Sequence, residues 1–224
     1  VVEVADEGFF GPSYDASVAA PAHDSARARE LLEGAGWYDR DGDGVLDRDG
    51  QPLALEFLIQ AKNVSAENFA RVFQESLAAI GVKLTVTALD NATYFQRIRA
   101  GEFDIGIQGW AVDATENDPA QLWHSSATEG GSNYSGVKDA FIDGLIARGQ
   151  VELDDAKRHA LWRELHRYLA EQVTPCIYRE ASPRKFALDR ALRGVQFFKI
   201  TPGYALRRWY WPAGTPGTRA TRAR

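Results

Sequence analysis

The chain contains no methionine and only one cysteine, Cys176. Because translation starts at methionine, we expect the sequence to be an excised or processed piece, with any export signal upstream of it. The chain opens with Val1-Val2-Glu3-Val4, which is not a secretory signal, and it lacks an apolar run of the roughly 18 residues that a membrane helix needs. A single cysteine excludes an internal disulfide, and its place in a strand-like run predicts a small buried thiol.

Clustered positive charge is lacking as well. The formal net charge is −5, and the only basic run is Arg219, Arg222 and Arg224 at the C-terminal end, where we expect a disordered tail. A protein that binds nucleic acid neutralises phosphates with grouped cations. We therefore expect no nucleic-acid partner.

The residue patterns of enzymes and metal sites are also missing from the sequence. It has no Gly-x-Ser-x-Gly elbow and no cysteine motif. None of its glycine-rich segments carries the lysine that a phosphate-binding loop requires. The four histidines are scattered, and His159 and His166 stand at i and i+7 of one predicted helix, whereas a helical zinc pair stands at i and i+4. We expect both histidines at the surface, and we predict no enzyme, no catalytic residue, no metal and no cofactor.

The sequence does contain strand and helix patterns in regular alternation. Three segments alternate apolar and polar residues as strands do, at 53–60, 82–88 and 103–108. Helical spacing lies between them, at 65–80 and 93–100; Ser65 is the expected cap of the first helix and Gly81 its stop. Strands and helices joined in this order by short connections predict an α/β fold with a central, mostly parallel sheet flanked by helices.

The same reading divides the whole chain into three parts. Residues 1–22 are an extended lead-in, residues 23–200 an α/β lobe, and residues 201–224 a tail. Further helices are predicted at 24–35, 138–148 and 154–172, and short strand-like runs at 176–179, 185–188 and 195–200.

One strand pattern runs straight into Gly109 and Trp110 and then into the carboxylate of Asp113. In α/β sheets, ligands bind in the crevice beyond the C-terminal ends of the strands. Glycine lets another backbone approach closely, tryptophan offers a flat apolar wall, and aspartate can hold a cationic group. These residue types predict a binding site, although the sequence equally allows Trp110 as a core residue and Asp113 as a cap.

The acidic segment from Asp39 to Asp47 imitates the start of an EF-hand loop. Aspartates occupy the first, third, fifth and ninth positions and glycine the sixth, but the twelfth position, which needs a bidentate carboxylate, is Gly50. A strand pattern follows instead of a second helix. We interpret the segment as a solvated turn, and a calcium-stabilised interaction module as the alternative.

The order of short motifs along the chain resembles the family 5 extracellular solute-binding proteins, the dipeptide-, oligopeptide- and nickel-binding group. The matching pieces are Asp24-x-x-x-Ala28-x-x-Leu31-Leu32-x-x-Ala35-Gly36-Trp37, Asp41-Gly42-Asp43-Gly44-Val45-Leu46-Asp47, Ile80-Gly81-Val82, Gly101-Glu102-Phe103-Asp104, Gly109-Trp110, Asp118-Pro119, Ser132-Asn133-Tyr134, and the helix with Arg158, Leu161, Glu164 and Leu165 before Pro175. Each motif is weak alone, but their common order is specific.

The resemblance implies a periplasmic-binding-protein-like lobe, the C-terminal one of a receptor whose two lobes close on a solute. Such a receptor works outside the cytoplasm, in the periplasm or anchored at the cell surface, as a monomer that delivers its ligand to an ABC permease in the membrane. A peptide is the leading ligand, although other members carry nickel chelates, oligosaccharides or opines. An isolated lobe exposes half of such a cleft, so we expect it to bind weakly or not at all.

The resemblance also assigns roles to the predicted site. In peptide-binding members the carboxylate after Gly-Trp pairs with the ligand's α-amino group, a role that maps onto Asp113. The backbone of Gly109–Ala111 pairs with the extended peptide like an added strand. The segment between Asp113 and Asp118 is longer than in many members, so Glu116 competes with Asp113 for that role.

Overall fold

A computed structural model of the chain describes residues 11–19, 22–110, 118–177, 186–198 and 203–213. These residues divide into two compact units. The sheet unit comprises Ser17–Trp110 and Pro119–Ala147, and the α6 unit comprises the described parts of Val1–Ala16, Ala111–Asp118 and Arg148–Arg224. The domain boundaries predicted after residues 22 and 200 stay predictions. Among the described residues, no helix is both long and apolar enough to cross a membrane.

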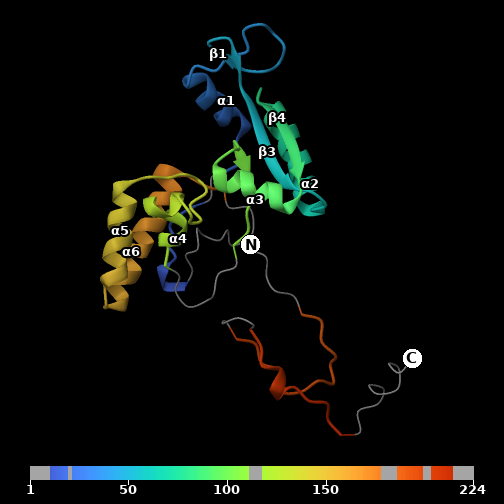
Figure 1. Ribbon diagram of the computed structural model, residues 1–224, viewed down its shortest axis with the longest axis vertical. Helices are drawn as coiled ribbons and strands as arrows, with labels where there is room; N and C mark the ends of the chain where they lie inside the picture. Colours follow the sequence, from blue (N-terminus) through green and yellow to red (C-terminus); the bar gives the residue numbers. More distant parts are fainter. Residues whose placement is uncertain (1–10, 20–21, 111–117, 178–185, 199–202, 214–224) are drawn as a thin grey trace, which may run out of the picture. The chain divides into compact units, whose positions relative to one another are not determined.

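The sheet unit is built on three parallel strands, as predicted. Strand β3 (Ala54–Gln60) lies between β4 (Lys83–Leu89) and β5 (Ile105–Gly106), and both neighbours run parallel to it. Helices α2 (Val64–Ala78) and α3 (Asn91–Ala100) make the two crossovers, and both pack on the sheet (Figure 1). The unit is therefore an α/β layer structure. Helix α1 (Ser25–Gly34) and the two-residue strands β1 (Asp47–Arg48) and β2 (Gln51–Pro52) precede it.

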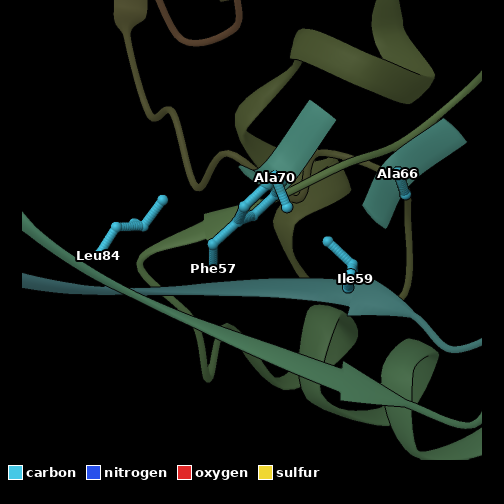
Figure 2. Close-up of a cluster of buried hydrophobic side chains, with 5 residues drawn as sticks. All are labelled: Phe57, Ile59, Ala66, Ala70 and Leu84. Atoms are coloured by element: carbon cyan, nitrogen blue, oxygen red, sulfur yellow. The ribbon is translucent and has the colours of Figure 1, made fainter. Parts of the chain in front are cut away.

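Strand β3 buries side chains on both of its faces. Phe57 and Ile59 pack with Leu84 of β4 against Ala66 and Ala70 of α2 (Figure 2). The alanines let the helix approach the sheet, and the rings of Phe69 and Phe73 meet Phe57 edge-on. Because successive residues of a strand point to opposite faces, the next residue, Leu58, is buried against α3 instead.

On the α3 face, a polar pair accompanies the apolar contacts. The Glu56 carboxylate lies 2.7 Å from a guanidinium nitrogen of Arg97 and accepts a hydrogen bond from the Thr87 hydroxyl. The hydrogen bond from Arg97 holds the pKa of Glu56 below its ordinary value. The pair links α3 to β3, while Thr87 adds β4 to the same contact.

Helix ends follow the expected chemistry with one correction. The predicted cap at Ser65 is wrong: α2 begins at Val64, and Asn63 accepts a hydrogen bond from the Ala66 amide. Asparagine at the position before the first helical residue is an equally strong cap, and Ser65 lies inside the first turn. Gly81 has a φ of 84°, and a β-carbon there would lie 2.7 Å from the Leu46 side chain. Its place after α2 therefore serves both the turn and the packing.

The α6 unit contains α6 (Asp155–Tyr168), which continues as one π-turn (Leu169–Val173). Helix α5 (Ala140–Val151) begins in the sheet unit and ends in this one. The short strands predicted beyond α6 are not strands in the described part of the chain, which holds only the isolated bridges Arg193–Tyr210 and Phe197–Tyr204 there. The prediction of a buried Cys176 is wrong, because this residue is exposed in a segment without strand pairing.

The predicted surface position of His166 is also wrong. His166 lies on the apolar stripe of α6 with Leu161, Trp162 and Leu165, and it is only 3% exposed. Its Nδ1 accepts a hydrogen bond from the backbone amide of Asp15 at 3.1 Å. The i, i+7 spacing between His159 and His166 does not show which face of α6 is buried, so it could not predict the burial of His166.

Three further contacts fasten the lead-in to α6. Its Gly11–Ser13 segment forms a turn of 3-10 helix rather than an extended chain. The Asp15 carboxylate pairs with Arg167, and Arg163 donates to the carbonyl of Pro12. The Tyr14 ring lies 5.1 Å from the His166 ring. The buried imidazole thus stands among Tyr14, the Asp15 carboxylate and the Arg167 guanidinium.

The burial of His166 beneath residues 12–15 predicts a pH-dependent stability. Burial lowers the pKa of His166, so the folded chain binds this proton less readily than the unfolded chain. The contribution is complete above the unfolded pKa of about 6.5 and is lost as the pH falls through the lower folded value. We expect the free energy of unfolding to fall below pH 6.5, by at most about 1.4 kcal/mol per pH unit from this residue.

Denaturant unfolding at pH 7.5, 6.5 and 5.5 measures this slope. We expect His166→Asn, which keeps an acceptor near the Asp15 amide, to flatten it, and His159→Asn on the same helix to leave it unchanged. An unchanged slope in His166→Asn would contradict the assignment.

Candidate functional site

The site predicted from the sequence stands where β5 leaves the sheet. Strand β5 is shorter than the predicted 103–108, because side chains take over its pairing at both ends. Before the strand, the Asp104 carboxylate accepts a hydrogen bond from the amide of Glu56 at 2.8 Å. This bond sets the register in which Phe57 faces Ile105. The α3 helix ends just upstream at Gly101, whose φ of 71° is left-handed.

Gly106 lets α3 lie directly on β5. A β-carbon at this position would lie 2.6 Å from Cδ1 of Ile98, so a larger residue would force the end of that side chain to shift. The neighbouring Ile105 and Ile107 point to the other face and pack with the α2 cluster. Gly106 thus favours close packing of α3 on β5, and its backbone is outside the left-handed region that a turn glycine occupies.

Tyr94 fixes the backbone after β5. The Tyr94 side chain is fully buried in the α3 cluster with Leu58 and Ile98. Its hydroxyl donates to the carbonyl oxygen of Ile107 and accepts from the Ile107 amide at 3.1 Å. Burial raises the pKa of Tyr94 above an ordinary value that already lies well above neutral, and the protonated phenol donates. One side chain therefore satisfies both backbone groups of the residue that leaves the sheet.

Gly109 and Trp110 follow this fixed point, and both are exposed. The Trp110 side chain is 46% exposed, so it is not a core residue of this unit. A β-carbon built on Gly109 meets no described atom within 4 Å. Packing within the described chain therefore does not explain the glycine, whereas an approaching ligand backbone would.

The Trp110 ring stacks on Tyr134, with ring centroids 5.9 Å apart and an angle of 22° between the ring planes. Tyr134 also packs against the α3 cluster that holds Tyr94. Its neighbour Asn133 is only 3% exposed, and its amide donates to the carbonyls of Val137 and His124. The Asn133 side chain thus holds together the loop that presents Tyr134, through hydrogen bonds to two of its backbone carbonyls.

The structure therefore brings Gly109 and Trp110 together with two residues whose roles the sequence did not reveal, Tyr94 and Tyr134. Tyr134 belonged to a recognised motif, and Tyr94 stands four residues before Ile98 on one face of α3, a spacing that signals a shared contact. Residues Ala111, Asp113 and Glu116 lie outside the described residues, and their roles stay predictions.

The acidic turn was the other candidate site. Carboxylate oxygens of Asp39, Asp41 and Asp43 lie within 4.8 Å of one another. These side chains accept hydrogen bonds from the turn's own backbone: Asp39 from Gly42 and Gly44, Asp41 from Asp43, and Asp43 from Val45. The Asp47 carboxylate pairs with Arg40 at 2.8 Å. The carboxylates thus have partners that account for their arrangement as a turn.

Comparison with known proteins gives a consistent result. Residues 3–133 match the family model of the bacterial extracellular solute-binding proteins, family 5 Middle. The chain is 32% identical over 160 residues to the oligopeptide-binding protein OppA of Mycobacterium tuberculosis, a match that covers 71% of this chain and 25% of OppA. It is 25% identical over 191 residues to the oligopeptide-binding protein AppA of Bacillus subtilis, covering 84% of this chain and 35% of AppA.

Solved structures show the same fold. The structure of AppA from Bacillus subtilis with a nonapeptide superimposes with a TM-score of 0.72 at 24% identity, covering 89% of this chain and 40% of that one. A mannohexaose-bound periplasmic oligopeptide-binding protein from Thermotoga maritima superimposes with a TM-score of 0.67 at 18% identity, covering 75% and 34%. The α/β architecture is that of a periplasmic-binding-protein-like lobe, as predicted. The chain spans about a third of the length of these proteins.

The Tyr94 hydroxyl gives a direct prediction. Tyr94→Phe keeps the buried ring but leaves the amide and carbonyl of Ile107 without this partner. We expect the free energy of unfolding to fall by about 1–3 kcal/mol, measured by urea unfolding. Tyr38→Phe removes the hydroxyl of a tyrosine that is 46% exposed and should change stability by less than about 0.5 kcal/mol. Equal effects of the two substitutions would contradict the role given to Tyr94.

The acidic turn gives a prediction about calcium. Because the backbone and Arg40 already engage its carboxylates, we expect the melting temperature to be the same with millimolar calcium and with chelator. A structural calcium site would raise it by mass action. A calcium-dependent rise that Asp41→Asn removes would restore the alternative of a calcium-stabilised module.

Proposed function

We propose that this chain, which belongs to the bacterial extracellular solute-binding proteins of family 5, helps to capture a peptide for an ABC importer. The observation that carries the proposal is the exit of β5, where Trp110 is half-exposed next to open space at Gly109. This is the end of a parallel strand, where ligands bind in α/β sheets. Both OppA and AppA are oligopeptide-binding proteins, and they support a peptide as the solute.

In this proposal the peptide lies against the backbone of Gly109–Ala111 as an added strand. Pairing of this kind uses main-chain hydrogen bonds and so tolerates many peptide sequences. The Trp110 indole covers the peptide from one side, and the carboxylate of Asp113 or Glu116 pairs with the α-amino group. Tyr94 supports the arrangement because the backbone leading into it is already fixed at Ile107.

The rest of the receptor is part of the proposal, because the chain spans only a third of its relatives. We infer a second lobe that closes over the ligand and a membrane permease that receives it. The receptor would work outside the cytoplasm, as a monomer, without a cofactor and without nucleic acid. The family is one of solute-binding proteins, and the proposal includes no catalytic step.

A different solute is the second candidate. The Thermotoga maritima relative was solved with mannohexaose bound, and a flat indole such as that of Trp110 suits a sugar ring as well as a peptide plane. The carboxylate separates the two ligands chemically, because a neutral oligosaccharide offers it no ammonium group.

The proposal is tested by purifying the full-length protein from its native host and identifying the bound solute by mass spectrometry. We expect peptides with free α-amino groups, bound again with micromolar or better affinity after the protein has been stripped. The chain of 224 residues alone is the control, and we expect it to bind weakly or not at all. Recovery of an oligosaccharide or a metal chelate would overturn the peptide assignment, and micromolar binding by the isolated chain would overturn the two-sided cleft.

The two carboxylates are tested by Asp113→Ala and Glu116→Ala in the full-length protein. Removing one partner of a buried charge pair costs about 2 kcal/mol or more, so we expect roughly 30-fold weaker peptide binding in the first variant. We expect Glu116→Ala to bind as the unmodified protein does. The reverse pattern would move the role to Glu116, and unchanged affinity in both variants would remove the carboxylate from the site.

A further inference from the structure

The stack of Trp110 on Tyr134 carries an inference that goes beyond the predicted site residues. Trp110 is 46% exposed, and an exposed indole on a chain that leaves a sheet has many rotamers open to it. The Tyr134 ring lies nearly parallel to it at 5.9 Å. An aromatic partner on one face restricts the rotamers and leaves the opposite face for another contact.

Tyr134 is itself held in place from two sides. Its ring packs on the buried cluster of Leu58, Tyr94 and Ile98, so it shares a foundation with the residue that fixes Ile107. Its backbone follows Asn133, whose buried amide binds two carbonyl groups of the same loop. Upstream in this loop, a β-carbon on Gly131 would collide with the Ala127 backbone, which shows how closely the loop folds on itself.

We propose that Tyr134 is a positioning residue of the solute site, which holds the Trp110 indole in the orientation that the ligand meets. The inference rests on the proposed function for the ligand and on the ring geometry of Trp110 and Tyr134 for the stack. Tyr94 fixes the backbone that precedes Gly109, and Tyr134 fixes the side chain that follows it. The ligand therefore meets a wall that is already ordered, and less conformational entropy is lost on binding.

The aromatic ring, rather than the hydroxyl of Tyr134, performs this role. Tyr134→Phe should therefore bind the ligand as the unmodified protein does, whereas Tyr134→Leu keeps apolar volume and loses the stack. A stacked aromatic pair is worth a few-fold to about tenfold in an equilibrium, so we expect Tyr134→Leu to weaken binding by about three- to tenfold. Phe95→Leu is the matched control, because Phe95 packs on the same cluster and meets Tyr94 edge-on.

The experiment is a double-mutant cycle in the full-length protein, with a free-amino pentapeptide pool as the probe. If Tyr134 acts through Trp110, Tyr134→Leu should have little further effect once Trp110→Leu is present. Additive losses would overturn the inference, as would a loss in Phe95→Leu equal to that in Tyr134→Leu. Melting temperatures of all variants separate a general loss of stability from a loss of binding.

A spectroscopic measurement tests, without any ligand, whether Tyr134 orders the Trp110 indole. In the chain of 224 residues, the near-ultraviolet circular dichroism difference between the unmodified protein and Trp110→Phe reports the environment of Trp110. We expect this difference to persist with Tyr134→Phe and to shrink with Tyr134→Leu, or with Tyr134→Met if the leucine variant does not fold. An unchanged difference would overturn the positioning role. If the full-length protein binds no peptide at all, the proposed function fails, while this measurement still decides the role of Tyr134.

Discussion

A buried hydroxyl, that of Tyr94, donates to the carbonyl of Ile107 and accepts from its amide, and this exchange fixes the chain where β5 ends. A strand that leaves a sheet loses its partners, and unpaired backbone groups near a core are costly. The tyrosine supplies both partners from α3. Strand β5 can therefore end after two residues, and the chain can present Gly109 and Trp110 without fraying into the sheet.

The sheet itself could be predicted from the sequence, because apolar residues recur at strand spacing in its strands and at helical spacing in the helices between them. Alternation in β3 and the helical spacing of α2 and α3 gave the parallel order and the crossovers. The strand exit could be predicted only in part. Gly109 and Trp110 were found from their residue types, but the contacts of Tyr94 and Tyr134 depend on side chains far apart in sequence. No local pattern encodes which tyrosine a strand end will meet.

Three predictions, those for Ser65, Cys176 and His166, were wrong because they used only the neighbouring sequence. The immediate neighbours of His166 and Cys176 do not show their burial, which depends on tertiary structure, whereas the cap of α2 depends on which residue begins the helix. The lead-in covers His166 from a distance of about 150 residues along the chain, through the amide of Asp15. Asn63 caps α2 where Ser65 was expected, since either residue type could serve and the start of the helix decides between them.

The central claim, that the exit of β5 is a solute-binding edge, is tested most directly by amide hydrogen exchange. The measurement compares the full-length protein with and without its captured solute, and it resolves single amides over residues 105–112. If the solute pairs with the backbone here, exchange at Gly109–Ala111 slows on binding, while exchange at Ile107 stays slow in both states because Tyr94 already holds its amide. Unchanged exchange at Gly109–Ala111 with solute bound would contradict the account.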